Sequence, residues 1–371
     1  MSSSPGPLER TPVPDPRIQQ YAALLVDQCL DIQPRQQVLV VSSPLARPLL
    51  EEVSRRVAAK GAYTLPRLSF GGPGADRIWA AEAPEELLRE PAPAEVRTWM
   101  DVDALIAIQA PENTREAAGL SPERLALLKE GSAPFLERVV SGSLPWVGCQ
   151  YPTPALAQDA EMSFAQFEDF LYGACLLDWD AERERMQRYA DRFDAADEVR
   201  IVGAATDLTL SLAGRSAKVD ARGANIPGGE FFFSPVEDSA EGVIHFAEFP
   251  AVYLGRELPG IRFRFERGRI VEASADRNED FLLKTLDSDE GARRLGELGV
   301  GCNPGITRYL RNTLFDEKID GTVHIAVGRG FPELGGSNVS AVHWDIVKDL
   351  RKGGQLFLDG ELVQENGSWQ F

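Results

Sequence analysis

The first half of the chain alternates between segments with helical spacing of apolar residues and short apolar runs. From Arg17 to about Gln150, helical spacing is seen in IQQYAALLVDQCL and LARPLLEEVSRRVAAKGA, and the strand-like runs are QVLVVSS, YTLPRLSF and VDALIAIQ. Strands that alternate with helices of about 10–15 residues are typical of a parallel sheet covered on both faces. Residues 17–190 are therefore predicted to form an N-terminal α/β domain with a largely parallel sheet.

The pattern changes in the second half of the chain. Residues 162–193 have helical spacing throughout, and we expect one helix here, with Ser163 as its N-cap, joining two domains. Strand-like segments follow, namely EVRIVGA, DLTLSLAG, GVIHFAEF, IRFRFERGRIVEASA, TVHIAVG and AVHWDIV. Helices are expected at about residues 278–286 and 289–298. Residues 191–371 are thus predicted to form a β-rich α+β domain, and residues 1–16 a disordered lead.

Charge and composition exclude several classes of partner. Of the 371 residues, 57 are acidic and 39 basic, which gives a formal net charge of -18. A surface that binds phosphate backbones needs the opposite sign, so nucleic acid is not an expected partner. No run of about 18 apolar residues is present, so no membrane partner is expected. The segment GGPGA at residues 71–75 lacks the spacing of a dinucleotide-binding fingerprint.

The cysteines and the N-terminal residues bear on the compartment. Cys29, Cys149, Cys175 and Cys302 are far apart in sequence and contain no CxxC pair. This is typical of thiols in a reducing compartment rather than of a disulfide framework or a zinc ribbon. The first residues, MSSSPGPLERTPVPDP, have no apolar signal-peptide core. A cytoplasmic location is therefore expected.

Candidate chemistry gathers around two of the three histidines. In AVHWDIV, His343 and Asp345 are two positions apart on a predicted strand, so their side chains leave the same face. An imidazole beside a carboxylate on a rigid strand can form half of a metal site. The bare tripeptide is more often a core histidine or a surface pair. His324, inside the strand-like GTVHIAVG, makes the metal interpretation about as probable as the structural one.

Two glutamates strengthen the metal interpretation. Glu230 follows a Pro-Gly-Gly turn and precedes three phenylalanines, and Glu297 lies where an expected helix ends before an apolar strand. A carboxylate in apolar surroundings is costly unless it is paired or bound to a cation. Either glutamate alone is more often an exposed turn residue.

Together these segments resemble a known family. NIPGGE, GARRLGELG, TLFDEKIDGTVHIAVG and GGSNVSAVHWD occur in the order found in the thermophilic aminopeptidases of family M29, the aminopeptidase T group. The central segments YPTPALAQDAEMS and FEDFLYGACLLDWD add to the resemblance, which covers nearly all of Arg17 to Phe371.

The resemblance implies a site and an activity. It implies two divalent ions, zinc, cobalt or manganese, held by two glutamates, two histidines and an aspartate: Glu230, Glu297, His324, His343 and Asp345. It also implies water activated by the ions, hydrolysis of the N-terminal residue of short peptides, and a homodimer that encloses a shared cavity. Glu297 is the expected bridging carboxylate and proton carrier.

One position departs from the family pattern. Seven residues after the histidine that matches His324, the family has a tyrosine whose phenol is thought to assist catalysis, and this chain has Phe331. A phenyl ring can neither donate a hydrogen bond nor bind a metal. The nearest tyrosine along the chain, Tyr309, is not an obvious substitute. Phe331 therefore predicts intact metal binding with reduced peptidase activity.

Two other functions stay open from the sequence. Two histidines and one carboxylate suffice for a mononuclear non-haem Fe(II) site, and some relatives of this fold resemble ring-cleaving pyridine dioxygenases. Retention of both Glu230 and Glu297 argues against this, because an oxygenase needs open positions at its iron. The third possibility is a weakly active homologue that binds peptide or metal with little turnover, as Phe331 suggests.

Overall fold

The computed structural model describes residues 15–70, 77–115 and 120–371. Most of the predicted N-terminal lead, residues 1–14, lies outside these ranges, as does the GGPGA segment.

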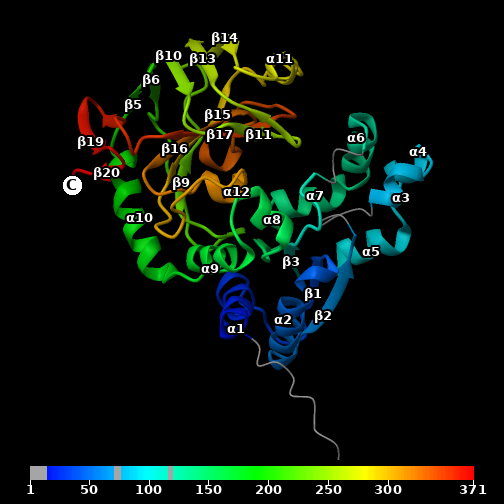
Figure 1. The fold of residues 1–371 in the computed structure, drawn as a ribbon. Helices are drawn as coiled ribbons and strands as arrows, with labels where there is room; N and C mark the ends of the chain where they lie inside the picture. The colour runs from blue at the N-terminus through cyan, green and yellow to red at the C-terminus, as the bar shows by residue number, and fades with distance from the viewer. Residues whose placement is uncertain (1–14, 71–76, 116–119) are drawn as a thin grey trace, which may run out of the picture.

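The N-terminal part is built on a parallel sheet (Figure 1). Each neighbouring pair runs parallel, as predicted from the alternation of helices and strands. The strands, in sheet order, are β2 (Tyr63–Leu68), β1 (Gln37–Ser42), β3 (Ala104–Gln109), β4 (Trp146–Gln150) and β8 (Asn225–Ile226). The last strand, β8, comes from the second half of the chain, so the two halves share this sheet.

Helices lie before and between the strands of the parallel sheet along the chain. The first begins where the Asp15 side chain accepts the Arg17 amide proton and Pro16 takes the first helical position. These helices are α1 (Pro16–Ala23), continued by a π-helical segment (Leu24–Cys29), a short 3₁₀ turn (Pro44–Ala46), α2 (Arg47–Ala59), α3 (Arg77–Glu82), α4 (Glu85–Arg89), α5 (Pro93–Asp101), α6 (Pro122–Gly131), α7 (Ala133–Val140) and α8 (Pro154–Asp159).

The single helix expected at residues 162–193 is in fact two helices. Ser163 does cap the first of them, α9 (Phe164–Cys175), in a reciprocal capping box with Gln166. Leu176 then leaves the helical conformation, with φ -101° and ψ 47°. Asp178 starts α10 (Trp179–Asp194) by accepting the Ala181 amide proton. The N-capping preference of aspartate therefore interrupts a pattern that is apolar at helical spacing throughout.

An antiparallel sheet lies on the outer side of the C-terminal half (Figure 1). Its strand order is β14-β13-β10-β6-β5-β18-β19-β20. The strands are β5 (Glu198–Gly203), β6 (Thr206–Ser211), β10 (Glu241–Phe246), β13 (Ile261–Glu266), β14 (Arg269–Ser274), β18 (Gln355–Leu358), β19 (Glu361–Glu365) and β20 (Ser368–Trp369). This sheet is accompanied by a hairpin of β11 (Ala251–Tyr253) and β12 (Arg256–Leu258). It is also accompanied by the helix α11 (Glu279–Leu286), which confirms the helix expected near residues 278–286.

A second antiparallel sheet carries the predicted site residues. Its order is β17 (His343–Asp349), β16 (Thr322–Gly328), β15 (Leu295–Gly301), β9 (Glu230–Phe233) and β7 (Lys218–Asp220). Every residue of β9, β15 and β16 is buried. The short helix α12 (Thr313–Asp316) precedes β16, and a 3₁₀ turn (Pro332–Leu334) follows it.

The prediction of a helix at residues 289–298 is wrong. Asp289 accepts the backbone amide protons of Ala292 and Ala341 and so holds a turn instead. The chain then enters β15 at Leu295, between β9 and β16. A Cβ atom at Gly296 would lie 2.2 Å from the Arg329 carbonyl oxygen, so a glycine permits this close strand pairing. Glu297 therefore lies within a strand, not at a helix end.

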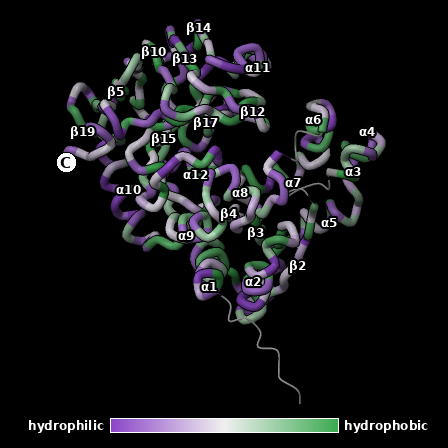
Figure 2. The backbone as a smooth tube through the Cα atoms, viewed as in Figure 1, coloured by the Kyte–Doolittle hydropathy of each residue, from purple (hydrophilic) through white to green (hydrophobic). Residues whose placement is uncertain are grey.

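One continuous core joins the two halves. Tyr21 and Phe167 belong to the same buried cluster as Phe231 and Trp344. The predicted boundary at residues 190/191 falls within α10, which is largely hydrophilic along its length (Figure 2). The division into two domains stays a prediction.

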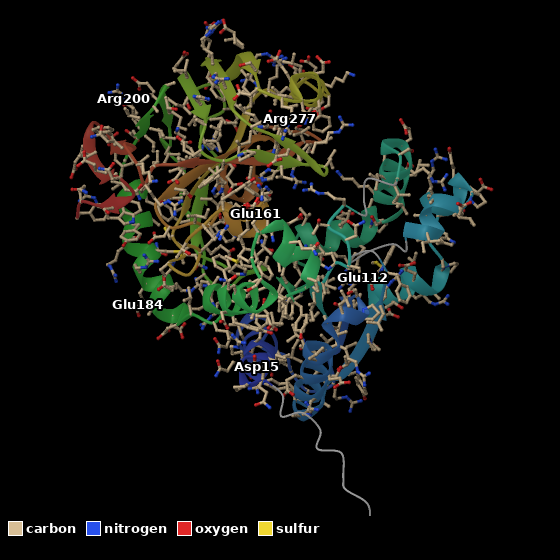
Figure 3. The ribbon with its side chains drawn as sticks, in the orientation of Figure 1. Asp15, Glu112, Glu161, Glu184, Arg200 and Arg277 are labelled. Atoms are coloured by element: carbon tan, nitrogen blue, oxygen red, sulfur yellow. The ribbon has the colours of Figure 1, made fainter. Side chains whose placement is uncertain are left out.

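Charged side chains such as Glu184 and Arg200 lie at the periphery of the fold (Figure 3). Among the described residues, no helix combines the length and the apolar character that crossing a membrane requires. All four cysteines are unpaired; three of them are buried and Cys29 is half-buried.

Candidate metal centre

The five predicted site residues project from one face of the central sheet. Residues paired directly across antiparallel strands have side chains on the same face. Gly301 pairs with Glu230, Gly299 with His324, Ala326 with Asp345, and Gly328 with His343. Glu297 pairs with Ala326 on the same face, next to a β-bulge. The structure thus brings together side chains from β9, β15, β16 and β17: Glu230, Glu297, His324, His343 and Asp345.

Glu297 lies at the middle of this cluster. Its Oε1 is 3.4 Å from Nε2 of His324, and its Oε2 is 3.2 Å from Nε2 of His343. On the inner side, Oε2 of Glu230 is 3.4 Å from the same nitrogen of His324. On the outer side, Oδ1 of Asp345 is 3.7 Å from Nε2 of His343. One carboxylate therefore joins an inner group (Glu230, Glu297, His324) to an outer group (Glu297, His343, Asp345).

Each of these side chains has a small residue opposite it on at least one neighbouring strand. These glycines and alanines are Gly299, Gly301, Ala326 and Gly328. A Cβ atom at Gly299 would lie 2.0 Å from Nε2 of His324. The small residues leave the space that the imidazole and carboxylate groups fill.

Replacing Gly299 with alanine should displace the His324 ring from the cluster. We expect the affinity of the protein for zinc, measured by calorimetric titration of metal-free protein, to fall by about 10–100-fold, the loss typical when the support of a metal ligand is disturbed. Gly203→Ala is the matched control, because its Cβ would lie 3.5 Å from its nearest neighbour, Lys348. Unchanged zinc affinity in Gly299→Ala would show that His324 is not a ligand.

Backbone carbonyl groups orient both histidines. Nδ1 of His324 is 3.0 Å from the Glu317 carbonyl oxygen, and Nδ1 of His343 is 2.8 Å from that of Arg329. A carbonyl can only accept, so each ring carries a proton on Nδ1 and turns Nε2 toward the carboxylates. This is the usual arrangement of a histidine that binds a metal through Nε2.

The charges of the cluster are strongly coupled. Burial alone would lower the pKa values of both histidines, but the carboxylates around them outweigh burial and raise the pKa of His324 to about 10 and that of His343 to about 9. Burial raises the pKa of Asp345, and the charge of Glu297 adds to this rise. In the metal-free protein both imidazoles are therefore protonated at neutral pH, and a bound cation must displace those protons.

A buried lysine completes the inner group. The Lys318 side chain is fully buried, and its Nζ is 3.1 Å from Oε1 of Glu230 and also contacts Oε1 of Glu317. Burial alone would lower the pKa of Lys318, but the charges of Glu230, Glu317 and Asp220 raise it, so the ammonium group keeps its charge. Since Lys318 occupies Oε1 of Glu230, only Oε2 of this carboxylate faces His324.

Lys318→Met should destabilise the metal-free protein. It would leave the buried Glu230 and the half-buried Glu317 without their cation, and breaking a buried ion pair in this way typically costs about 3–5 kcal/mol. We expect a loss of that size in the free energy of unfolding from urea denaturation. The exposed Lys352 offers a control, since Lys352→Met should change the free energy by at most about 0.5 kcal/mol. A similar small change in Lys318→Met would contradict a charged Lys318.

Phe331 lies beside the outer group. Its ring centroid is 5.3 Å from that of His343, in an edge-to-face arrangement, and 5.1 Å from that of Phe232. Its backbone amide donates to Oγ of Ser234, and that hydroxyl donates to the Gly296 carbonyl oxygen, each at 2.8 Å. The loop that carries Phe331 is thus fixed against β15.

The donor set fits divalent cations. Two ligand atoms about 2.1 Å from a tetrahedral zinc ion lie about 3.4 Å apart, and the distances in the cluster run from 3.2 to 3.7 Å. Oε2 of Glu230 and Oδ1 of Asp345 are buried and accept no hydrogen bond from any described residue. Leaving buried carboxylate oxygens without partners is costly, and a cation in each group would satisfy them.

Sequence reasoning missed three residues of this centre. Glu317 and Lys318 stand in the TLFDEKIDGTVHIAVG segment, where an adjacent pair of opposite charges precedes a strand that is apolar except for His324. That contrast is the signal by which they could have been found. Gly299 could not be identified without the strand register. The third histidine, His245, lies on β10 in the other antiparallel sheet and takes no part in the cluster.

Comparison with known proteins identifies the class of protein. The family model described as thermophilic metalloprotease (M29) matches residues 14–369. The chain therefore belongs to the M29 family and is a metallopeptidase, a hydrolase of peptide bonds. The resemblance drawn from the sequence motifs is confirmed.

Particular relatives support this assignment. Aminopeptidase T of Thermus thermophilus is 27% identical over 410 aligned residues, which cover 95% of this chain and 98% of the relative. The solved structure of wild-type AmpT from Thermus thermophilus superimposes with a TM-score of 0.82 at 24% identity, covering 96% of this chain and 99% of that one. It confirms the α/β fold with a parallel sheet and β-rich antiparallel sheets.

A dioxygenase shares the scaffold more distantly. The structure of 2,5-dihydroxypyridine dioxygenase from Pseudomonas putida KT2440 matches with a TM-score of 0.61 at 18% identity, over 96% of this chain and 98% of that one. This likeness concerns the fold alone.

Proposed function

We propose that the chain is an aminopeptidase that removes the N-terminal residue of short peptides with two divalent cations. The inner cation would be held by Glu230, Glu297 and His324, and the outer one by Glu297, His343 and Asp345. The observation that carries the proposal is the position of Glu297, whose two oxygens face the two histidines separately. Zinc, cobalt and manganese all suit this mixture of imidazole and carboxylate ligands.

Each part of the centre has a task in this reaction. Bound ions would activate water and polarise the scissile carbonyl group. The carbonyl oxygens of Glu317 and Arg329 hold the two imidazoles in the orientation required. Lys318 contacts one oxygen of Glu230 and leaves the other free to bind the inner cation. Glu297 is the proposed carrier of the proton from the attacking water to the leaving amine.

The oxygenase alternative is less well supported. A mononuclear iron site with two histidines and one carboxylate leaves three positions open for oxygen and substrate. Here three carboxylates, Glu230, Glu297 and Asp345, surround the two histidines. The donor set is too large for one open iron site and suits a pair of ions. A cytoplasmic location and a homodimer stay predictions.

Removal of metal tests the proposal. Exhaustive chelation should abolish the hydrolysis of aminoacyl amides, and adding zinc, cobalt or manganese should restore it. Because both histidines must lose a proton to bind a cation, restoration should require more metal at pH 6 than at pH 8. Rates of amide hydrolysis against free metal concentration at the two pH values give the answer. Hydrolysis that persists after metal loss is verified would rule out the proposed chemistry.

A further inference from the structure

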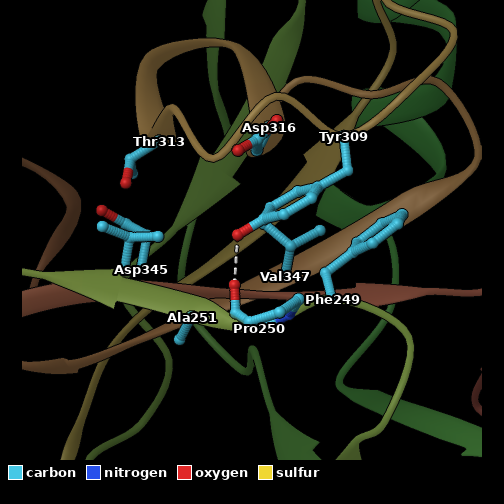
Figure 4. Close-up of a pocket in the computed structure, with 9 residues that line it drawn as sticks. Phe249, Pro250, Ala251, Tyr309, Thr313, Asp316, Asp345 and Val347 are labelled. Carbon is cyan, nitrogen blue, oxygen red and sulfur yellow. Dashed lines mark hydrogen bonds between the residues drawn. The ribbon is translucent and has the colours of Figure 1, made fainter. Parts of the chain in front are cut away.

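A small hollow lies next to the candidate metal centre (Figure 4). Its volume is about 20 Å³. Residues from the start of β11, the segment before β16, and β17 line it, among them Phe249, Pro250, Ala251, Tyr309, Asp345 and Val347. We call it the Tyr309 pocket.

The pocket and the metal centre share a residue. His343, Asp345 and Val347 alternate along β17, so their side chains leave the same face of the sheet. Asp345 belongs to the outer group of the centre and also lines the pocket, and Val347 is the next residue on that face. The Cβ atom of an N-terminal residue is only two bonds from the carbonyl carbon that is attacked. A side chain attached there would reach a space directly beside the metal ligands.

Two polar side chains of the pocket are already engaged. The Tyr309 hydroxyl donates to the Pro250 carbonyl oxygen. The Asp316 carboxylate accepts the backbone amide protons of Leu310 and Asn312, at 2.7 and 2.6 Å. The Tyr309 ring also stacks on Phe249, with centroids 4.8 Å apart and planes inclined by 7°. The surface that faces the hollow is therefore mainly apolar, and a charged group placed there would meet only Thr313 and the carboxylate of Asp345 as further polar partners.

The volume limits what can enter. A cavity needs about 10–15 Å³ to hold one water molecule, and the hollow offers about 20 Å³, so it admits a small group. We infer that the Tyr309 pocket receives the side chain of the N-terminal residue and selects small apolar side chains, alanine above leucine. This inference rests on the proposed aminopeptidase function.

The test compares two substrates in one preparation. The ratio of kcat/KM for the 4-nitroanilides of alanine and leucine does not depend on enzyme concentration or on the fraction loaded with metal. The wild-type protein should favour alanine by about tenfold or more, as pockets that exclude extra methylene groups do. Phe249→Ala removes one wall and should reduce this ratio by about tenfold or more.

A matched control and a second variant complete the design. Phe281 on α11 packs against a different tyrosine, Tyr253, with ring centroids 6.4 Å apart, so Phe281→Ala should leave the ratio unchanged. Ala251→Val fills the pocket and should lower kcat/KM for the alanine anilide relative to that for the glycine anilide. This second variant tests the inference if Phe249→Ala does not fold. A wild-type ratio near one, or ratios that neither pocket variant alters, would overturn the inference while leaving aminopeptidase activity established. Hydrolysis of no aminoacyl anilide by metal-loaded protein would overturn both.

Discussion

Glu297→Gln should lower kcat/KM on aminoacyl amides by about 10²–10⁴-fold, the range expected when a group that carries a proton in the transition state is lost. The effect should be this large because Glu297 contacts both histidines, one through each oxygen. An uncharged amide can neither share two cations nor accept a proton. We also expect the variant to bind less metal, which elemental analysis of the purified protein measures.

Glu182→Gln provides the control for this change. The Glu182 side chain is 18% exposed and is paired with Arg185 at 2.6 Å, outside the cluster. Its replacement should leave metal content and kcat/KM near the wild-type values. If Glu297→Gln keeps both full activity and full metal content, Glu297 does not bridge two ions.

Phe331→Tyr should increase turnover. If the family's tyrosine stabilises the oxyanion, its absence costs about 10²–10³ in kcat, or about 2.7–4 kcal/mol, and the restored phenol can regain up to that factor. The Phe331 ring already packs edge-to-face on His343, so a hydroxyl group on it would lie close to the outer group. A site adapted to phenylalanine can hold the new hydroxyl out of line, which would reduce the gain. Measurement of kcat on aminoacyl amides, at unchanged metal content, gives the result.

Phe232→Tyr serves as a matched control for the added hydroxyl. Phe232 is buried next to Phe331, with ring centroids 5.1 Å apart. It is not the position at which the family has its tyrosine. It should not increase kcat. A flat kcat in Phe331→Tyr with intact metal binding would mean that another group supplies the hydrogen bond or that the natural reaction does not require one.

Most of the architecture could be predicted because the apolar pattern matched the structure locally. The alternation of strands and helices before Gln150 predicted the parallel sheet, and Ser163 marked the start of α9. The segment 289–298 was wrongly predicted to be a helix because Asp289 and the charged residues after it are typical of a helix start. In the structure its last residues form β15, which pairs with β9 and β16. Local pattern cannot reveal such long-range pairing.

The candidate site was predicted in part for a similar reason. The five cluster residues stand out because each is a polar side chain within an apolar segment, and the family motifs include them. The roles of Lys318 and Gly299 depend on residues that are distant in sequence. Lys318 forms an ion pair with Glu230, and Gly299 leaves room for the ring of His324. The Tyr309 pocket combines β11, the loop before α12 and β17, so it could be found only from the folded structure.

The number of ions bound per chain tests the central claim most directly. Metal-free protein, titrated with zinc in a calorimeter and checked by elemental analysis after removal of free metal, should bind two ions per chain. Glu230→Gln should weaken only the inner ion, and Asp345→Asn only the outer one, since each residue belongs to one group. Binding of a single ion that survives both substitutions, or of one iron in place of two zinc ions, would contradict the two-cation centre.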